Sequence, residues 1–257
     1  MNPPEIFTGM EKTMPSQLPR NHELQLAGNF VQNTGCNIFL TGKAGTGKTT
    51  FLHTLKKNTA KRMIVTAPTG VAAINAGGVT LHSFFQLPFG PFIPGSQTYE
   101  SNRQRLFRFS KEKIRIIKSL DLLVIDEISM VRADLLDAVD AVLRHHRRSN
   151  QPFGGVQLLM IGDLHQLSPV AKPEEWRLLQ QHYASVYFFS SHALELTRFH
   201  TIELAHIYRQ SDVNFIKLLN QVRDNRLDDA GIAELNQRYV PDFTSGDDQG
   251  YITRSEE

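Results

Sequence analysis

Cysteine is almost missing from this sequence, because Cys36 is the only one among 257 residues. A single thiol cannot form a disulfide within the chain. This excludes the small secreted folds that depend on disulfides and favours a reducing compartment. A small apolar residue beside a strand is the ordinary role of such a cysteine, and we assign no chemistry to it.

Long apolar runs are also absent. No stretch of about 18 apolar residues occurs, so no membrane-spanning helix is predicted. Residues 1–20 contain four prolines and no apolar segment of the kind found in signal peptides. We therefore expect a flexible leader over residues 1–20, no membrane partner, and an intracellular protein that lies in the cytoplasm or nucleoid if its source is bacterial.

An excess of charge of one sign is lacking too, since 28 Lys and Arg residues face 26 Asp and Glu residues and the net charge is +2. The chain as a whole is therefore not a polycation. Basic residues nevertheless cluster, with seven of them between Arg103 and Lys118 against the single acid Glu112, and a second group at Arg144–Arg148. Such clusters suit phosphate binding, and the alternative of a solvated helix face stays open.

A complete phosphate-binding motif is present, because residues 42–49 read Gly-Lys-Ala-Gly-Thr-Gly-Lys-Thr. An apolar strand pattern precedes it at 37–41, and helical spacing follows it over 48–58. Glycines let backbone N–H groups approach phosphates, and the helix N-terminus adds positive potential. Lys48 would neutralise the β- and γ-phosphates and the Thr49 hydroxyl would ligate Mg²⁺. The alternative is a glycine-rich turn without a ligand.

Two further apolar strands end in polar residues. The first runs over 122–127, where Asp126 would reach Mg²⁺ and Glu127 would orient and deprotonate the attacking water. The second runs over 158–170, where Gln166 would contact the γ-phosphate or the water. Solvated acids after an ordinary strand are the alternative for the first pair.

A third polar strand end occurs at Thr69, which is a good N-cap for a helix over Gly70–Asn75. The exposed N-terminus of that helix suits a second phosphate, such as one of a DNA strand, although a plain helix cap is the alternative.

Strand and helix patterns alternate along the chain, which predicts an α/β fold with crossover connections and a mostly parallel sheet. The expected strands are Asn37–Thr41, Met63–Ala67, Leu122–Asp126, Val156–Ile161, Val186–Phe189 and Thr201–Leu204. The expected helices are Lys48–Asn58, Gly70–Asn75, Gln104–Ser119, Arg132–His146, Glu174–Tyr183, Asp212–Arg223 and Asp228–Tyr239. The proline- and glycine-rich stretch Gln86–Ser101 interrupts the alternation as an inserted loop.

Together these segments resemble the Pif (petite integration frequency) family of DNA helicases, in helicase superfamily one. The matching blocks read FLTGKAGTGKTTFL, APTGVAAINAGGVTLHSFF, LLVIDEISMVRADLLDAVD, PFGGVQLLMIGDLHQLSPV and LAHIYRQ. The resemblance covers about Gln25 to Gln210. The stretch with Met130, Val131 and Asp134 is similar to the signature helix of the family.

The resemblance implies a RecA-like P-loop NTPase with a three-layer α/β/α fold, and it implies roles for residues at matching positions. Gln25 matches a glutamine that reads adenine, and Arg209 matches an arginine that contacts the γ-phosphate. Lys48, Glu127 and Gln166 complete the catalytic set. The expected nucleotide contacts are Gln25, Gly42, Lys43, Ala44, Gly45, Thr46, Gly47, Lys48, Thr49 and Thr50, and the expected metal ligands are Thr49 and Asp126.

Single-stranded DNA and duplex junctions are the partners that the resemblance implies. The expected DNA contacts are Pro68, Thr69, Gly70, Thr80, His82, Phe84 and His165. Phe84 would stack on a base, although its spacing with Leu81 and Phe85 also fits a core residue. The stretch 86–101 would be a small wedge that separates strands, and its apolar residues folding back onto the domain is the alternative.

Domain organisation follows from the same resemblance. We expect the first RecA-like domain at 21–199 and the start of an incomplete second one at 200–257, because only 47 residues follow Gln210 and an α/β domain needs upwards of ~100. The chain would thus be a truncated product or one part of a split protein.

The leading expectation is an ATP- and Mg²⁺-dependent DNA helicase that moves 5′ to 3′. The sequence leaves its oligomeric state open and favours a monomer. The alternatives are a nucleotide- and DNA-binding fragment with little turnover, or a P-loop ATPase that serves as a loader or remodeller.

Overall fold

A computed structural model describes residues 21–96, 106–208, 212–237 and 239. The expected leader, the end of the inserted loop at 97–101 and Arg209 lie outside the described residues. The chain forms two compact units, Met1–Arg209 and Gln210–Glu257. None of the helices in the described ranges is long and apolar enough to cross a bilayer.

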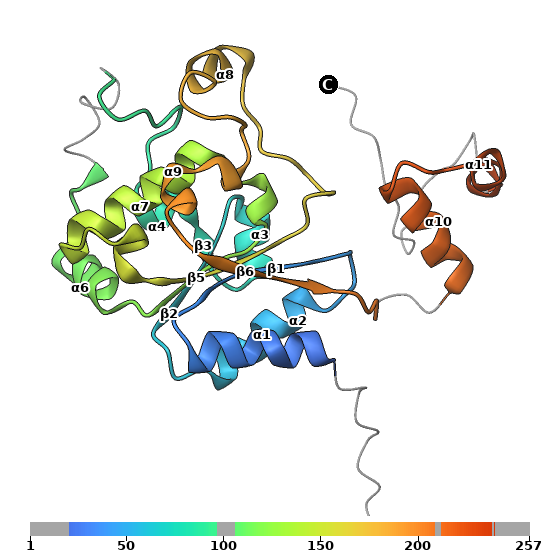
Figure 1. Ribbon diagram of the computed structural model, residues 1–257, viewed down its shortest axis with the longest axis horizontal. Helices are drawn as coiled ribbons and strands as arrows, with labels where there is room; N and C mark the ends of the chain where they lie inside the picture. Colours follow the sequence, from blue (N-terminus) through green and yellow to red (C-terminus); the bar gives the residue numbers. More distant parts are fainter. Residues whose placement is uncertain (1–20, 97–105, 209–211, 238, 240–257) are drawn as a thin grey trace, which may run out of the picture. The chain divides into compact units, whose positions relative to one another are not determined.

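A six-stranded parallel sheet forms the centre of the first unit (Figure 1), and its strand order is β3-β2-β4-β5-β1-β6. The strands are β1 Asn37–Gly42, β2 Met63–Ala67, β3 Val79–Thr80, β4 Leu122–Ile125, β5 Gln157–Gly162 and β6 Phe199–Leu204. The predicted α/β class and parallel sheet are confirmed. β3 was not predicted, because a two-residue strand carries no periodic signal.

Helices cover both faces of this sheet. They are α1 His22–Asn33, α2 Lys48–Asn58, α3 Gly70–Asn75, α4 Leu81–Phe85, α6 Lys111–Ser119, α7 Ala133–Arg147, α8 Pro173–Leu179 and α9 His192–Glu195. In β1, Ile38 and Leu40 pack with α1 and α2, whereas Phe39 packs with α4, α6 and α7. Successive strand residues point to opposite faces, so the two cores make the three-layer α/β/α arrangement.

Three predicted elements differ from the structure. Val186–Phe189 is not a strand but leads into a 3₁₀ turn at Phe188–Ser190. The prediction was wrong because periodicity alone cannot distinguish a short buried strand from another short apolar segment. The described part of the helix expected over Gln104–Ser119 is interrupted at 107–110, and α6 begins at Lys111, where the Ser110 side chain accepts a hydrogen bond from the Lys113 N–H. The helix expected at Glu174–Tyr183 ends at Leu179.

The first unit also extends beyond the expected boundary at residue 199. Strand β6 pairs with β1 along its whole length, from Phe199 opposite Asn37 to Leu204 opposite Gly42. Residues 199–204 therefore complete the first sheet rather than begin another domain.

Two capped helices are described in the second unit. They are α10, Val213–Arg223, and α11, Asp229–Asn236. The Asp212 and Asp228 carboxylates each accept a backbone N–H from the first turn of the following helix, which fixes where both helices begin.

Candidate nucleotide site

Sheet topology brings the predicted nucleotide motifs to one edge. β5 lies between β4 and β1, with Met160 opposite Ile125 and Gly162 opposite Thr41. All three strands are parallel, so the segments that follow them leave the sheet at the same carboxyl edge. Ligands of open α/β sheets bind at this edge, where the phosphate loop, Asp126 and the 163–166 turn meet.

Glycine is required at both ends of the phosphate loop. Gly42 has φ 151°, and a Cβ there would lie 2.8 Å from the Leu204 carbonyl oxygen and 2.9 Å from Thr46 Oγ1. Gly47 has φ 94° and is the N-cap of α2. The loop thus turns directly into the helix, and the first N–H groups of α2 have no partner within the helix.

Lys48 is held over the loop it belongs to. Its ammonium donates to the carbonyl oxygens of Gly42, at 2.5 Å, and Lys43, at 3.0 Å. The same charge acts on Asp126 and Glu127 and favours their ionised forms. The phosphate loop and the two acids therefore lie within electrostatic reach of one another.

Asp126 and Glu127 are half-buried carboxyl groups with raised pKa values. Burial is the main cause for both, and the neighbouring carboxylate of Asp126 raises the pKa of Glu127 further. Glu127 has φ 51°, in the left-handed region, and its N–H donates to Asp126 Oδ1 at 3.1 Å. This backbone geometry ends β4 and turns the two side chains away from the strand.

The turn after β5 is organised by the buried Asp163. Its carboxylate accepts hydrogen bonds from the His165 N–H, at 3.1 Å, and the Gln166 side-chain amide, at 2.9 Å. Asp163 also adds to the negative potential at Glu127. Gln166 is exposed, and it is tied to the same acidic cluster as Glu127 through Asp163.

Gln25 lies on α1 and shares a shallow cavity of about 240 Å³ with Thr50 of α2. Both side chains are exposed, as is that of Thr49. The cavity runs between α1 and α2, and its lining includes Thr50, the residue that follows the phosphate loop. Arg209 is not described, so its expected contact stays a prediction.

Tyr208 is a site residue that the sequence analysis missed. Its N–H donates to the Gly45 carbonyl at 2.8 Å, and its hydroxyl accepts from Asn21 Nδ2 at 3.0 Å. Tyr208 thereby fastens the chain after β6 to the phosphate loop. The block LAHIYRQ was the available signal, but only its arginine was singled out.

The expected DNA contacts divide into two groups. Six of them follow strand ends at the carboxyl edge and are at least partly accessible: Pro68, Thr69, Gly70, Thr80, His82 and His165. Phe84 is 9% exposed and packs in the core with Leu81 and Phe85. The expectation that Phe84 stacks on a base is therefore wrong, because helical spacing turns it inward with those two residues.

The inserted loop is part core and part projection. Leu87 and Phe92 are buried, whereas Phe89 is 91% exposed and stacks on His82 with ring centroids 5.6 Å apart. Two side chains at the start of α7 anchor the loop. Arg132, the N-cap residue, donates to the Gly90 carbonyl at 3.0 Å, and Asp134, in the first turn, accepts the Phe92 N–H at 2.9 Å. The alternative that apolar residues fold back onto the domain therefore holds for Leu87 and Phe92, and the wedge stays a prediction that concerns the exposed Phe89.

No group of three or more His, Cys, Asp or Glu side chains that could hold a metal gathers anywhere in the described ranges. Mg²⁺ prefers oxygen ligands and takes one or two carboxylates beside phosphate oxygens and water. The Thr49 hydroxyl and the Asp126 carboxylate supply oxygen atoms of this kind, and their role as metal ligands stays a prediction.

Comparisons with known proteins agree with this geometry. The family model described as PIF1-like helicase matches residues 23–231. The chain is 36% identical over 258 residues to the ATP-dependent DNA helicase PIF1 of Saccharomyces cerevisiae, covering 96% of this chain and 28% of that protein. It is 37% identical to human PIF1, covering 84% and 32%.

A solved structure is also similar, the Bacteroides Pif1 helicase in complex with ADP-AlF3 and single-stranded DNA. It superposes with a TM-score of 0.83 at 43% identity, covering 92% of this chain and 53% of that one. The chain thus spans about three tenths of the length of these two curated relatives and about half of the solved chain.

Proposed function

The chain belongs to the PIF1-like helicase family, and on that premise we propose that it carries the ATP-hydrolysing motor domain of a DNA helicase. The observation that supports this most directly is the meeting of Lys48, Asp126 and Glu127 at the carboxyl edge of the sheet. In the proposal, ATP hydrolysis drives 5′-to-3′ movement on single-stranded DNA and unwinding of a duplex junction.

ATP binding is assigned to the loop Gly42–Thr50. Its backbone N–H groups and the first turn of α2 surround the phosphates, and Lys48 moves from its carbonyl partners to the phosphate oxygens. Gln25 contacts the adenine beside the cavity that it shares with Thr50. Thr49 and Asp126 hold Mg²⁺, which neutralises phosphate charge when bound.

Glu127 is the proposed general base. A base works best when its pKa is close to the working pH, and burial raises the pKa of Glu127 in that direction. Gln166, positioned by Asp163, contacts the γ-phosphate or the attacking water. Arg209 follows the anchored Tyr208 and is assigned to the charge that develops on the γ-phosphate.

DNA binding is proposed across the loops at the same edge. Thr69 caps α3 and Thr80 caps α4, so two helix N-termini accompany Pro68, Gly70, His82 and His165 along this edge. Single-stranded DNA would lie on these groups. Residues 210–257 would begin a second motor domain.

Substitution of the phosphate-loop lysine tests the proposal. Lys48→Ala should abolish hydrolysis and weaken ATP binding, because the phosphates lose their main cation. Lys57→Ala, at the exposed end of α2, is the matched control and should leave both intact. Hydrolysis and fluorescent ATP-analogue binding are measured with and without single-stranded DNA.

The same measurements separate the alternatives. Stimulation of hydrolysis by DNA supports the motor. If the parent chain binds ATP but does not hydrolyse it, the chain is a nucleotide- and DNA-binding fragment. If it hydrolyses ATP at the same rate with and without DNA, a loader or remodeller is indicated. If Lys48→Ala and the parent hydrolysed ATP at the same rate, the phosphate loop would not be the site of hydrolysis.

Strand separation is assigned to the exposed tip of the inserted loop. Phe89 projects while Leu87 and Phe92 keep the loop in the core, so a point substitution is a cleaner test than deletion. Phe89→Ala should impair duplex unwinding by the whole helicase and spare DNA-stimulated hydrolysis. Unchanged unwinding would show that the tip is not a wedge.

A further inference from the structure

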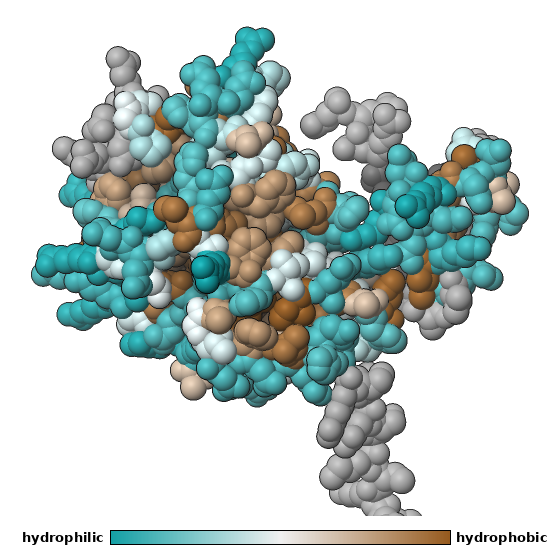
Figure 2. Space-filling view, in the orientation of Figure 1, coloured by the Kyte–Doolittle hydropathy of each residue, from teal (hydrophilic) through white to brown (hydrophobic). Residues whose placement is uncertain are grey.

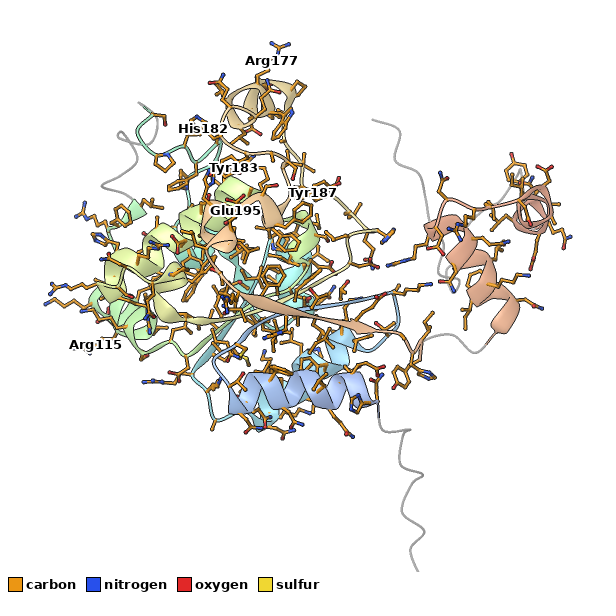
Figure 3. All side chains as sticks on the ribbon, viewed as in Figure 1. Arg115, Arg177, His182, Tyr183, Tyr187 and Glu195 are labelled. Carbon is orange, nitrogen blue, oxygen red and sulfur yellow. The ribbon has the colours of Figure 1, made fainter. Side chains whose placement is uncertain are left out.

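Helix α6 carries a row of exposed cations on one side. Lys111, Arg115 and Lys118 are spaced at i, i+4 and i+7, which places them along a single stripe about 10 Å long. All three are exposed, and Figure 3 shows Arg115 on the outer side of the helix. We refer to these three residues as the α6 stripe.

The end of α7 extends the stripe. Arg147 donates to the carbonyl oxygens of Ile117, Lys118 and Leu120, which fastens the C-terminus of α7 to that of α6. Arg148 follows as the exposed C-cap of α7. Figure 2 shows hydrophilic side chains gathered over this part of the first unit.

Helix stability accounts for Lys118, a cation in the last turn of α6, but not for the rest of the stripe. Lys111 is the first residue of α6, where a positive charge opposes the helix dipole, and the like charges of Lys111 and Arg115 repel each other at i, i+4. Three other cations of the unit form ion pairs: Arg62 with Asp121, Arg132 with Asp134 and Arg144 with Asp140. Within the described ranges, no carboxylate forms an ion pair with a member of the stripe.

The stripe leads away from the proposed DNA-binding edge. The first turn of α6 lies beside α4, because Lys113, on the side of α6 opposite the stripe, donates to the Ser83 carbonyl of α4 at 3.1 Å, next to His82. At its other end, α6 is separated from the start of β4 by two residues, and α7 likewise finishes ahead of β5. Helix α6 therefore begins near the candidate DNA contacts and ends toward the amino edge of the sheet, and the stripe runs along its outer side.

The two aromatic side chains that directly precede α6 in the described ranges are both stacked on histidines. Phe107 stacks on His145 with ring centroids 4.2 Å apart, and Phe109 stacks on His146 at 4.8 Å. Single strands are held largely by bases stacked on aromatic side chains, whereas a duplex presents its phosphates and keeps its bases inside. The chemistry therefore fits the phosphate backbone of a DNA duplex.

We propose that the α6 stripe, with Arg148, binds the backbone of duplex DNA next to the junction that the motor would engage. This inference rests on the proposed helicase function, because that function supplies the duplex. The site is separate from the single-strand contacts at the carboxyl edge.

The test compares three variants of the chain. Lys111→Ala/Arg115→Ala/Lys118→Ala removes the stripe, and Lys111→Arg/Arg115→Lys/Lys118→Arg keeps its charge. Lys57→Ala/Arg177→Ala/Arg198→Ala removes three exposed cations elsewhere, with Arg177 on α8 far from Arg115 in Figure 3. Affinity for a blunt duplex and for single-stranded DNA is measured by fluorescence anisotropy over a range of salt concentrations, with circular dichroism as a check of folding.

Loss of the stripe should weaken duplex binding roughly tenfold or more at about 0.1 M salt. The slope of log affinity against log salt should become less negative by about 2.7, from three phosphate contacts at about 0.9 each. The charge-conserving variant should bind like the parent, and single-strand affinity should change less than twofold.

Duplex affinity and salt slope equal to those of the cation control would overturn the proposal, as would an equal loss of single-strand affinity. The two proposals can fail separately. A chain that does not hydrolyse ATP but loses duplex affinity with the stripe refutes only the motor. If hydrolysis is stimulated by DNA but duplex affinity does not change when the stripe is removed, only the proposal that the α6 stripe binds duplex DNA is refuted.

Discussion

Two groups of three acidic residues lie in the first unit, and their carboxyl groups differ in the hydrogen bonds that they accept. The acids of α7 are Asp134, Asp137 and Asp140, and those at the nucleotide edge are Asp126, Glu127 and Asp163. Both groups are withdrawn from water. They differ in how many hydrogen-bond donors surround them.

Asp137 represents the first group. Its carboxylate accepts hydrogen bonds from the Tyr183 hydroxyl, the Ser191 hydroxyl and the N–H groups of His192 and Ala193. Figure 3 shows Tyr183 beside α9, the short helix that these bonds hold against α7. Asp134 and Asp140 likewise accept the backbone N–H groups of Phe92 and Phe153.

The second group is mixed, because within the described residues Asp126 and Asp163 accept hydrogen bonds whereas Glu127 does not. Glu127 is half-buried and faces the charges of Asp126 and Asp163, and no described residue donates a hydrogen bond to its carboxylate. A desolvated acid without donors is costly for stability, and such groups gather where chemistry needs a shifted pKa. The comparison teaches that burial alone does not mark Glu127 as functional, and that its lack of donors among the described residues separates it from the other five acids.

The largest expected effect is at Asp137. Asp137→Ala removes the acceptor of four donors and should lower the free energy of unfolding by roughly 3–5 kcal/mol. Urea denaturation measures it, with Glu195→Ala on the exposed side of α9 as the control. A decrease in the free energy of unfolding of less than about 1 kcal/mol would contradict the structural role assigned to Asp137.

The next effect is catalytic. Glu127→Gln should keep nucleotide binding and reduce hydrolysis by roughly a hundredfold, because the amide cannot accept the proton of the attacking water. Glu112→Gln, an exposed acid on α6, should leave the rate unchanged. Hydrolysis by Glu127→Gln at the parent rate would remove Glu127 as the base.

A smaller effect concerns stability and pH. Burial raises the folded-state pKa of Glu127 above its ordinary value of 4.5, which applies in the unfolded chain. At pH values between the unfolded-state pKa and the folded-state pKa, the folded protein therefore binds more protons than the unfolded chain. The parent should therefore lose stability as the pH rises through this window, and Glu127→Gln should lose less. Unfolding midpoints in urea that fall in parallel for both proteins would contradict the assigned shift.

The smallest effect is expected at an exposed acid that does have donors. Arg62 lowers the pKa of Asp121 to about 2 through a side-chain hydrogen bond. The pair stabilises the fold above pH 3.8, and this contribution disappears as the pH falls through about 2. Solvent screening limits it, so Asp121→Asn should cost less than about 1 kcal/mol at neutral pH. A larger loss would show that donors matter even at the surface.

The sequence by itself determined the local parts of this protein. The phosphate loop at 42–49, the helices Lys48–Asn58 and Gly70–Asn75 and the strand Met63–Ala67 were predicted with their observed bounds. Glycine conformation, helix capping and hydrophobic periodicity act over a few residues, so they can be read in order along the chain.

Only the tertiary structure decided which distant groups meet. It placed Tyr208 on the phosphate loop, turned Phe84 into the core and gave Asp137 donors from 46 to 56 residues away. These contacts depend on the order of parallel strands and the packing of helices across them. Such long-range pairings leave no periodic trace in a sequence, because each partner is locally compatible with several environments.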